Sequence, residues 1–375
     1  MLKRTSEELI VKSLLEDKKV VILFGARQVG KTTLSNKLLS EYDGRKLSVN
    51  ADEIKYTDIL TSRDFSKMKL LLDGYDLLFI DEAQRIPDIG INLKIIADNM
   101  PDLKILVTGS SSFDLANKIK EPLTGRSATF RLYPFSLQEL KQEMTVFELQ
   151  NRMEEYLIYG LYPDITLYSN SRDKEKYLLE LASSYLYKDI LELSTIRNSS
   201  KINQLLRLIA FQTGSEVSLN EIAKSLGMSQ ETVDSYIDLL EKSFVLFRIG
   251  GFSRNLRKEI TKRDKIFFWD LGIRNCIIQN FASLSFRTDT GALWENFMVA
   301  ERLKYLNNNG ITVSPYFWRT YTGAEVDYIE EKNGALYGYE IKYSKAGKKA
   351  PKAWTENYGQ NFHYVTRDNF HEFVL

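Results

Sequence analysis

The sequence predicts an α/β protein whose N-terminal third forms a doubly wound parallel sheet. Three features support this prediction: an apolar run over residues 20–24 that leads into a glycine-rich turn, a helix-like segment over residues 34–39, and a second apolar run over residues 77–80 that ends in two acids. Short, wholly apolar runs are typical of parallel strands that are buried on both faces. Their alternation with helical patterns predicts strand–helix–strand units.

The turn after the first apolar run has the spacing G-x-x-x-x-G-K-T of a phosphate-binding loop. Gly25 and Gly30 let the backbone N–H groups converge on phosphate oxygens, and the next helix directs the positive end of its dipole towards them. We expect Lys31 to contact the β- and γ-phosphates of ATP, and Thr32 to contact Mg²⁺. The predicted nucleotide-binding residues are Gly25, Ala26, Arg27, Gln28, Val29, Gly30, Lys31, Thr32 and Thr33.

The second apolar run ends in Asp81 and Glu82, at the carboxyl end of a predicted strand, where doubly wound sheets bind their ligands. Asp81 is predicted to hold Mg²⁺ together with Thr32. Glu82 is predicted to polarise the water that attacks ATP. The alternative is that the two acids only cap the following helix, but their place downstream of a complete phosphate-binding loop favours catalysis.

A further strand, over residues 104–107, ends in Thr108 and a run of small polar residues. Thr108 is predicted to sense the γ-phosphate or to orient the attacking water, and Ser110 is an alternative candidate. Ser111 or Ser112 can also act as a helix N-cap. The two roles are compatible with each other.

Length and composition limit the classes of function. A chain of 375 residues is long enough for roughly two to four domains. The net charge of +1 selects neither nucleic acid nor a membrane surface, and the single cysteine, Cys276, excludes an internal disulfide. The sequence contains only two histidines, which argues against a histidine-based zinc site. No apolar run reaches the roughly 20 residues of a membrane span, and no signal-peptide core is present, so we expect a cytoplasmic protein without a membrane partner.

The first third resembles an AAA+ ATPase in its phosphate-binding loop, its Asp-Glu strand end, its Thr-Gly-Ser strand end and a Gly-Arg pair before a strand over residues 129–132. The resemblance implies an AAA+ core over residues 1–135 and a helical lid over residues 136–200. It also implies a ring, a hexamer by default, in which Arg126 is an arginine finger towards the neighbouring subunit's nucleotide. Arg85 is the rival for this role, and a local ion pair is the alternative role for Arg126.

Residues 201–270 resemble a winged helix. Ser218 opens a short helix, Gly227 makes the turn and Ser229 caps a second helix. The second helix carries the acids Glu231, Asp234, Asp238 and Glu241, which oppose DNA phosphates. The basic residues that we predict to contact DNA follow the wing strand and are Arg254, Arg257, Lys258, Lys262 and Arg263. The alternative for these residues is a solvated charged loop.

Residues 271–375 resemble a PD-(D/E)XK nuclease. Residues 337–343 alternate as a strand, with Glu340 and Lys342 on one face, and Asn333-Gly334 is a hairpin signal that brings Asp327 beside them. Glu295, on a predicted helix, is expected near the same place. The resemblance implies that Asp327 and Glu340 bind Mg²⁺, that Lys342 positions or activates the attacking water, and that Glu295 contacts the metal either directly or through one of its ligands. The alternative is an exposed Glu/Lys pair on an edge strand.

The whole arrangement resembles a large family of bacterial and archaeal AAA+ ATPases that carry a C-terminal domain of unknown function. It implies a Mg²⁺-dependent ATPase that binds and remodels DNA, including branched or single-stranded DNA, as a ring-shaped oligomer. One alternative is an ATP-gated nuclease that uses Asp327, Glu340 and Lys342. Another is a signalling or defence ATPase that binds a protein partner through its winged helix.

Overall fold

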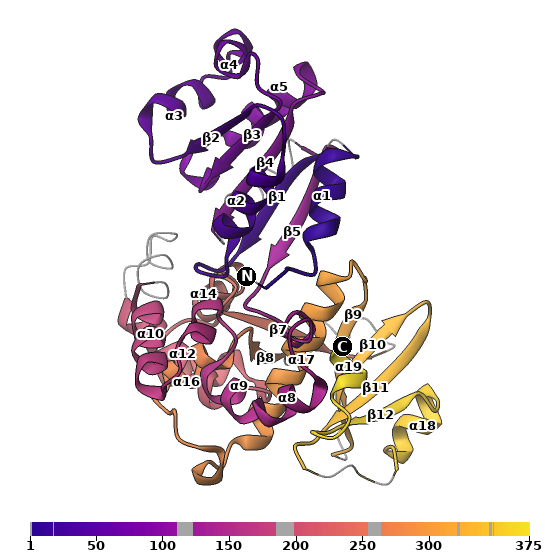
Figure 1. The fold of residues 1–375 in the computed structure, drawn as a ribbon. Coiled ribbons are helices and arrows are strands. Elements are labelled where there is room, and N and C mark those ends of the chain that lie inside the picture. The colour runs from indigo at the N-terminus through magenta and orange to yellow at the C-terminus, as the bar shows by residue number, and fades with distance from the viewer. Residues whose placement is uncertain are drawn as a thin grey trace. The chain divides into compact units, whose positions relative to one another are not determined.

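The structure is a computed structural model that describes residues 2–17, 19–110, 123–184, 199–253, 264–320, 323–344, 347 and 349–375. It divides into two compact units (Figure 1). The first contains Lys3–Tyr133 and Lys242–Phe244, and the second contains Pro134–Glu241 and Val245–Leu375. The long segment of the first unit ends at Tyr133, and the ATPase core was expected to end at residue 135.

The first unit is built on one parallel sheet with the strand order β2-β3-β4-β1-β5. Its strands are β1 (Val20–Gly25), β2 (Lys46–Asn50), β3 (Leu77–Asp81), β4 (Lys104–Ser110) and β5 (Ser127–Leu132). The helices are α1 (Glu7–Leu15), α2 (Lys31–Glu41), α3 (Ile54–Leu60), α4 (Phe65–Leu72) and α5 (Ile89–Asn99), with the 3₁₀ turn η1 (Ala83–Arg85). Every residue of β1 is buried, as expected for a central parallel strand. The predicted doubly wound parallel sheet is confirmed.

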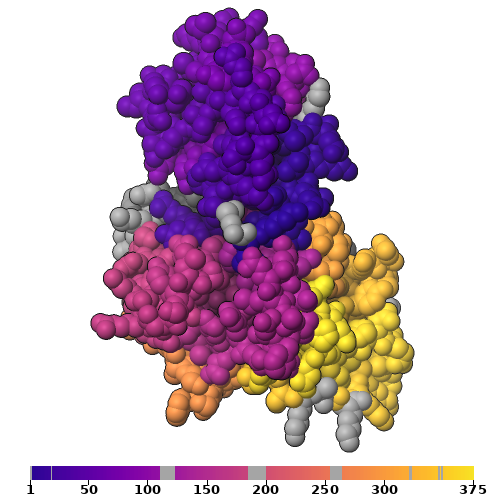
Figure 2. Space-filling view, in the orientation of Figure 1, coloured from indigo at the N-terminus to yellow at the C-terminus, as the bar shows by residue number. Residues whose placement is uncertain are grey.

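The second unit contains a mixed sheet with the order β12-β11-β10-β9-β7-β8-β6. Its strands are β6 (Glu216–Val217), β7 (Leu246–Gly251), β8 (Asp264–Phe268), β9 (Ser314–Arg319), β10 (Glu325–Lys332), β11 (Ala335–Ile341) and β12 (Phe362–Val365). Strand β7 pairs with β9 in parallel through Gly250 and Tyr316. The boundary predicted at residue 270 therefore separates two segments whose strands share one sheet. Figure 2 shows the later of these segments in orange and yellow.

The second unit also contains helices, most of which are labelled in Figure 1. They are α7 (Leu137–Leu140), α8 (Val146–Asn151), α9 (Met153–Tyr159), α10 (Ser171–Ser184), α12 (Ser199–Phe211), α13 (Leu219–Leu226), α14 (Gln230–Lys242), α16 (Leu271–Ile277), α17 (Thr290–Asn308), α18 (Lys352–Tyr358) and α19 (His371–Val374), with the 3₁₀ turns η2 (Pro163–Leu167) and η4 (Leu284–Phe286). The predicted helix-turn-helix signals have their expected local roles. Ser218 caps α13, and Gly227 ends it in the left-handed conformation. Ser229 accepts a hydrogen bond from the Thr232 amide at the start of α14.

The segment that was predicted to form a lid packs within the second unit. The buried Glu301 carboxylate accepts a hydrogen bond from the Leu137 amide (2.6 Å), and Lys304 donates to the Phe135 carbonyl (3.1 Å). Asp270 caps α16 and also accepts from the Leu161 amide (2.7 Å). Gly160, with a φ of 72°, allows this approach because a Cβ at this position would overlap the Asp270 carboxylate. Closure of these helices over ATP stays a prediction.

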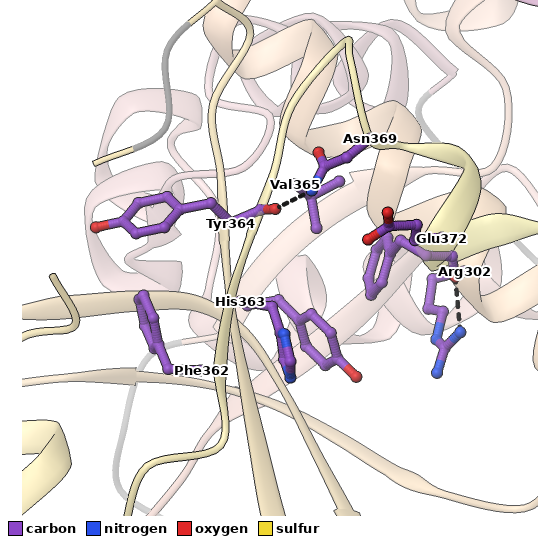
Figure 3. A pocket seen from close by; sticks show the side chains of 9 residues that line it. Arg302, Phe362, His363, Tyr364, Val365, Asn369 and Glu372 are labelled. Carbon is purple, nitrogen blue, oxygen red and sulfur yellow. Dashed lines mark hydrogen bonds between the residues drawn. The ribbon is translucent and has the colours of Figure 1, made fainter. Parts of the chain in front are cut away.

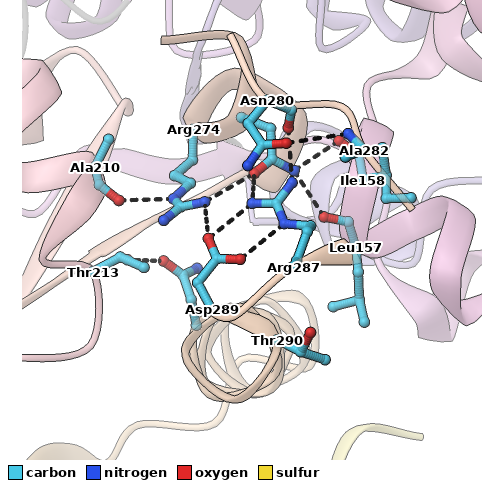
Figure 4. A network of polar contacts seen from close by, with 12 residues as sticks. Leu157, Ile158, Ala210, Thr213, Arg274, Asn280, Ala282, Arg287, Asp289 and Thr290 are labelled. Atoms are coloured by element: carbon cyan, nitrogen blue, oxygen red, sulfur yellow. Dashed lines mark hydrogen bonds and ion pairs between the residues drawn. The ribbon is translucent and has the colours of Figure 1, made fainter. Parts of the chain in front are cut away.

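A buried polar network joins α12, α16 and α17 (Figure 4). Arg274 donates to the Ala210 carbonyl (2.8 Å) and to Asp289 (2.7 Å), and Arg287 also donates to Asp289 (2.8 Å). Burial raises the pKa of the Asp289 carboxyl, but the hydrogen bonds and charges of the two arginines outweigh it and lower the pKa to about 2. Asp289 therefore stays ionised at neutral pH, and its bonds to the two arginines hold α12, α16 and the start of α17 together.

Candidate functional site

The glycine-rich turn has the backbone conformation that its sequence predicts. It leaves β1 at Gly25 and enters α2 at Lys31. A Cβ at Gly25 would overlap the Leu132 carbonyl of the neighbouring strand β5, and Gly30 has a left-handed φ of 94°. Both positions therefore require glycine, one because of close packing and the other because of its backbone angle.

Two cations hold this turn. The Lys31 ammonium, whose residue is 6% exposed, donates to the carbonyls of Gly25 and Ala26 at 2.7 Å each. The buried Arg4 guanidinium donates to the Val29 carbonyl and to the Tyr133 carbonyl (3.2 Å). Sequence reasoning did not identify Arg4, because no motif links it to a turn more than twenty residues later in the chain.

The two predicted Mg²⁺ residues lie side by side. The Thr32 hydroxyl, at the start of α2, donates to one Asp81 oxygen (3.1 Å) at the end of β3. The Thr108 hydroxyl, from β4, donates to the other Asp81 oxygen. Strand β4 lies between β1 and β3 in the sheet, which explains why Thr108 meets Asp81. Hydroxyl and carboxylate oxygens are ligands that Mg²⁺ prefers, so these residues fit the ion.

Glu82 directly follows Asp81 and has a left-handed φ of 55°. Its amide donates to the Thr108 hydroxyl (3.3 Å), and its carboxylate accepts a hydrogen bond from Gln84. A positive φ in a residue other than glycine costs free energy and is common at functional sites. The turn thus gives Glu82 a fixed place next to Asp81, and its catalytic role stays a prediction.

The candidates for an arginine finger both have local carboxylate partners. Arg126 pairs with Asp98 at 2.6 Å, and its side chain is 48% exposed. Arg85 pairs with Asp52, and both side chains are about half exposed. The local ion pair that the sequence left open for Arg126 is therefore present within one chain. Exposed pairs of this kind contribute little stability, so either arginine is able to change partner.

The acids of the second helix of the helix-turn-helix have a partner on β7. The Arg248 guanidinium pairs with Asp234 (2.6 Å), Asp238 and Glu241 (2.7 Å). The Arg248 side chain therefore forms its ion pairs with residues of the second unit itself. The residues predicted to contact DNA, Arg254, Arg257, Lys258, Lys262 and Arg263, lie outside the described residues.

The structure brings together the side chains of the predicted nuclease constellation. Strands β10 and β11 pair antiparallel through the Asn333-Gly334 turn. One Asp327 oxygen accepts from the Ile341 amide (2.8 Å) and from the Lys342 ammonium (3.3 Å). Lys342 also pairs with Glu340 at 2.7 Å. The expected neighbourhood of these three side chains is present, and their roles stay predictions.

Two residues that sequence reasoning missed, Lys265 and Glu325, complete this group. The Lys265 ammonium, from β8, lies 2.9 Å from Glu295, 2.7 Å from Glu325 and 3.8 Å from Asp327. Glu295 belongs to α17, so the lysine joins a helix to the sheet. The sequence does contain a signal for Lys265, because a lysine near the start of the otherwise apolar strand of residues 264–268 needs a buried partner. We call Glu295, Glu325, Asp327 and Glu340 the acid cluster.

Burial dominates the electrostatics of the acid cluster. It raises the pKa of Glu295 to about 7, an effect that Lys265 opposes and the Asp327 charge reinforces. It also raises the pKa of Glu340, and Asp327 adds to this shift while Lys342 opposes it. Throughout the residues that the structure describes, no three acidic, histidine or cysteine side chains are arranged to hold a metal ion. Lys265 and Lys342 already pair with Asp327, and Lys342 also pairs with Glu340, so the acid cluster does not fit the Mg²⁺ that the nuclease resemblance implies.

A cavity of about 500 Å³ lies beside β11 and β12 (Figure 3). Its walls include Tyr339, His363 and Phe373, and the Arg302 side chain reaches it. The Arg302 guanidinium makes two hydrogen bonds to Glu330 (2.6 and 2.9 Å) and one to the Phe373 carbonyl (2.6 Å). Asn369 and Glu372 also line the cavity, so its walls combine aromatic rings with polar side chains.

In the described part of the chain, no helix is long and apolar enough to cross a membrane.

Three family models match the chain. A model described as "AAA domain" matches residues 17–141, and a "Domain of unknown function (DUF4143)" matches residues 290–369. Another "Domain of unknown function (DUF8612)" matches residues 150–284. The first match contains the complete phosphate-binding loop, Asp81, Glu82 and Thr108.

Curated relatives cover most of the chain. An uncharacterized protein of Mycobacterium tuberculosis, Rv2008c, is 30% identical over 331 residues, which are 86% of this chain and 70% of that protein. An uncharacterized protein of Methanocaldococcus jannaschii, MJ1544, is 24% identical over 86% of this chain and 75% of its own length. The AMPPCP-bound structure of DnaA from Aquifex aeolicus is 15% identical with a TM-score of 0.27, over 63% of this chain and 86% of that chain, a likeness too low to carry an argument. The chain combines a P-loop ATPase domain of the AAA class with a C-terminal DUF4143 domain, and it belongs to the family of the Mycobacterium tuberculosis protein.

Proposed function

We propose that the protein is a Mg²⁺-dependent ATP hydrolase of the AAA+ class that acts in the cytoplasm. The observation that carries this proposal is the meeting of Thr32, Asp81 and Thr108 at the carboxyl edge of the parallel sheet. Thr32 and Asp81 would hold Mg²⁺, which supplies positive charge to the phosphates. Lys31 and the amides of the turn would bind the phosphates, and Glu82 would accept a proton from the attacking water.

Phosphate release from ATP tests this proposal directly. We expect turnover that requires Mg²⁺ and that falls at least tenfold in Asp81→Asn, since one metal ligand loses its charge. Asp88→Asn is a matched control, because Asp88 lies in the same unit and forms an exposed pair with Arg63. Equal turnover in both variants would remove Asp81 from the site.

We propose DNA, including branched or single-stranded DNA, as the partner that this ATPase remodels. Five of the ten residues 254–263 are basic and one is acidic. Arg248 offsets the charge of Asp234, Asp238 and Glu241, which reduces the repulsion that α14 would exert on phosphates. The basic segment follows β7 and would bind the DNA backbone.

Charge reversal tests the DNA proposal. We expect Arg257→Glu combined with Lys258→Glu to weaken DNA binding and to flatten its dependence on salt, because fewer counterions are released. Lys176→Glu on α10 is the control, since its side chain is exposed on another helix. Unchanged affinity in the double variant would exclude the segment. ATP turnover that DNA does not stimulate would favour the switch that binds a protein partner.

We propose that Arg126 acts across a subunit boundary in a ring, with a hexamer as the expected size. Its exposed pair with Asp98 leaves it able to reach a neighbouring nucleotide. If Arg126 acts in trans, mixing Arg126→Ala with Glu82→Gln chains restores turnover, because each supplies what the other lacks. If the Asp98 pair is its whole role, Asp98→Asn reproduces the effect of Arg126→Ala and mixing restores nothing.

A further inference from the structure

The acid cluster has a lysine where the nuclease resemblance implies a divalent metal ion. We propose that Lys265 is a tethered cation that takes the place of that ion, so that the second unit holds its clustered carboxylates together without Mg²⁺. This inference concerns a different site from the proposed ATPase and does not depend on it. It also assigns no DNA cleavage to Asp327, Glu340 and Lys342.

The surroundings of Lys265 support this assignment. The residue is 3% exposed, and its ammonium lies within 4 Å of carboxylates from three acids on two elements, α17 and β10. The buried Phe317 ring, 5.5 Å from the ammonium, closes another side. An ammonium ion that is enclosed in this way is unable to exchange its carboxylate partners for water, so it acts as a fixed part of the fold.

Lys342 supplies a second positive charge to the acid cluster. It pairs with Glu340 and Asp327, and its side chain is 47% exposed. The two ammonium groups together supply the charge of one divalent ion. They meet at Asp327, where one oxygen faces Lys265 and the other faces Lys342 and the Ile341 amide. Each Asp327 oxygen thus has an ammonium partner within 4 Å that belongs to the chain.

Mn²⁺ binding to the full-length, nucleotide-free chain tests the proposal. Free Mn²⁺ is measured by electron paramagnetic resonance in wild type, Asp327→Asn, Lys265→Met and the double variant. We expect wild type and Asp327→Asn to bind the same number of ions, since Mn²⁺ at Asp81 contributes equally to both. Lys265→Met should bind one additional ion per chain, and the double variant should lose it. Lys265→Arg keeps the charge and should bind like wild type.

Thermal unfolding supplies a second readout for Lys265→Met. Mn²⁺ should raise the melting temperature of Lys265→Met, because an ion that binds only the folded state stabilises that state. In wild type, the increase that Mn²⁺ causes should be no larger than the increase in Asp327→Asn. Wild-type Mn²⁺ binding that is lost in Asp327→Asn would overturn the proposal, and this comparison decides even if Lys265→Met does not fold. A folded Lys265→Met chain that gains no ion would overturn it as well.

Discussion

Asp81 in the first unit and Asp327 in the second are both strand carboxylates, and their partners differ in charge. Asp81 accepts hydrogen bonds from the hydroxyls of Thr32 and Thr108. Asp327 lies between Lys265 and Lys342 and accepts from the Ile341 amide. Neutral donors orient a carboxylate and leave its charge in place, whereas ammonium groups offset that charge.

This difference teaches that the residue type alone does not identify a metal site. An aspartate that is oriented by hydroxyls keeps the charge that attracts Mg²⁺. An aspartate that is already paired with two buried or half-buried lysines would have to lose those partners first. We therefore propose metal-dependent chemistry in the first unit and a metal-free structural role for the acid cluster.

The largest expected effect is on nucleotide binding. Lys31→Ala removes the ammonium at the start of α2, and we expect ATP affinity to fall by roughly 100-fold or more, since a charge-assisted contact to phosphate is lost. Titration with a fluorescent ATP analogue measures this. Lys67→Ala, at an exposed position of α4, is the control. Retained tight binding in Lys31→Ala would contradict the assignment of the phosphate-binding loop.

Glu82→Gln should separate binding from hydrolysis. The amide keeps the shape of the side chain but accepts no proton, so we expect turnover to fall by roughly 100-fold or more while ATP stays bound. Phosphate release and ATP binding are measured on the same preparation, with the exposed Glu53→Gln as control. Near-normal turnover in Glu82→Gln would mean that another group activates the water.

Lys265→Met should affect stability and leave ATP turnover unchanged. It removes one partner of a buried ion network, which typically costs about 3 kcal/mol of unfolding free energy. All four tryptophans, Trp269, Trp294, Trp318 and Trp354, lie in the second unit, so their fluorescence during urea unfolding follows that unit alone. A turnover loss equal to that of Glu82→Gln would show that the two sites are not independent.

The pH dependence of stability should reveal Glu295. Burial raises the pKa of Glu295 from 4.5 to about 7, so the folded chain binds this proton more tightly than the unfolded chain. The stability from this proton is complete below about pH 4.5 and is lost as pH rises towards 7, by on the order of 2 kcal/mol.

The matched variants for this prediction are Glu295→Gln and Glu331→Gln. Glu295→Gln cannot titrate, so its unfolding free energy should fall less between pH 5 and pH 7 than that of wild type. Glu331, on β10, is exposed, and its variant should follow wild type. Parallel pH profiles for wild type and Glu295→Gln would exclude Glu295 as the titrating group.

The sequence was most informative where the site is contiguous in the chain. The glycine-rich turn, Asp81, Glu82 and Thr108 each lie at or next to the carboxyl end of a strand, and a parallel sheet brings such strand ends to one edge. The hairpin signal at Asn333-Gly334 likewise placed Asp327 near Glu340. Local spacing and strand periodicity are sufficient in these cases, because the backbone alone sets the neighbours.

The sequence was least informative where a single side chain crosses between distant elements. Arg4, Lys265 and Arg248 each hold partners from other strands or helices, and no spacing rule links them to those partners. Arg248, for example, pairs with three acids of α14. Pairing of this kind depends on tertiary packing, which motif reasoning does not resolve.

One measurement tests the contrast between the two sites most directly. The purified chain is incubated with Mg²⁺ and ATP, alone and with single-stranded, duplex or four-way-junction DNA, and both phosphate release and DNA integrity are followed. The account predicts Mg²⁺-dependent turnover that Glu82→Gln abolishes, DNA that stimulates this turnover, and no DNA cuts. Cuts that disappear in Asp327→Asn and Lys342→Ala would contradict it, because they would make the acid cluster a metal-dependent nuclease site.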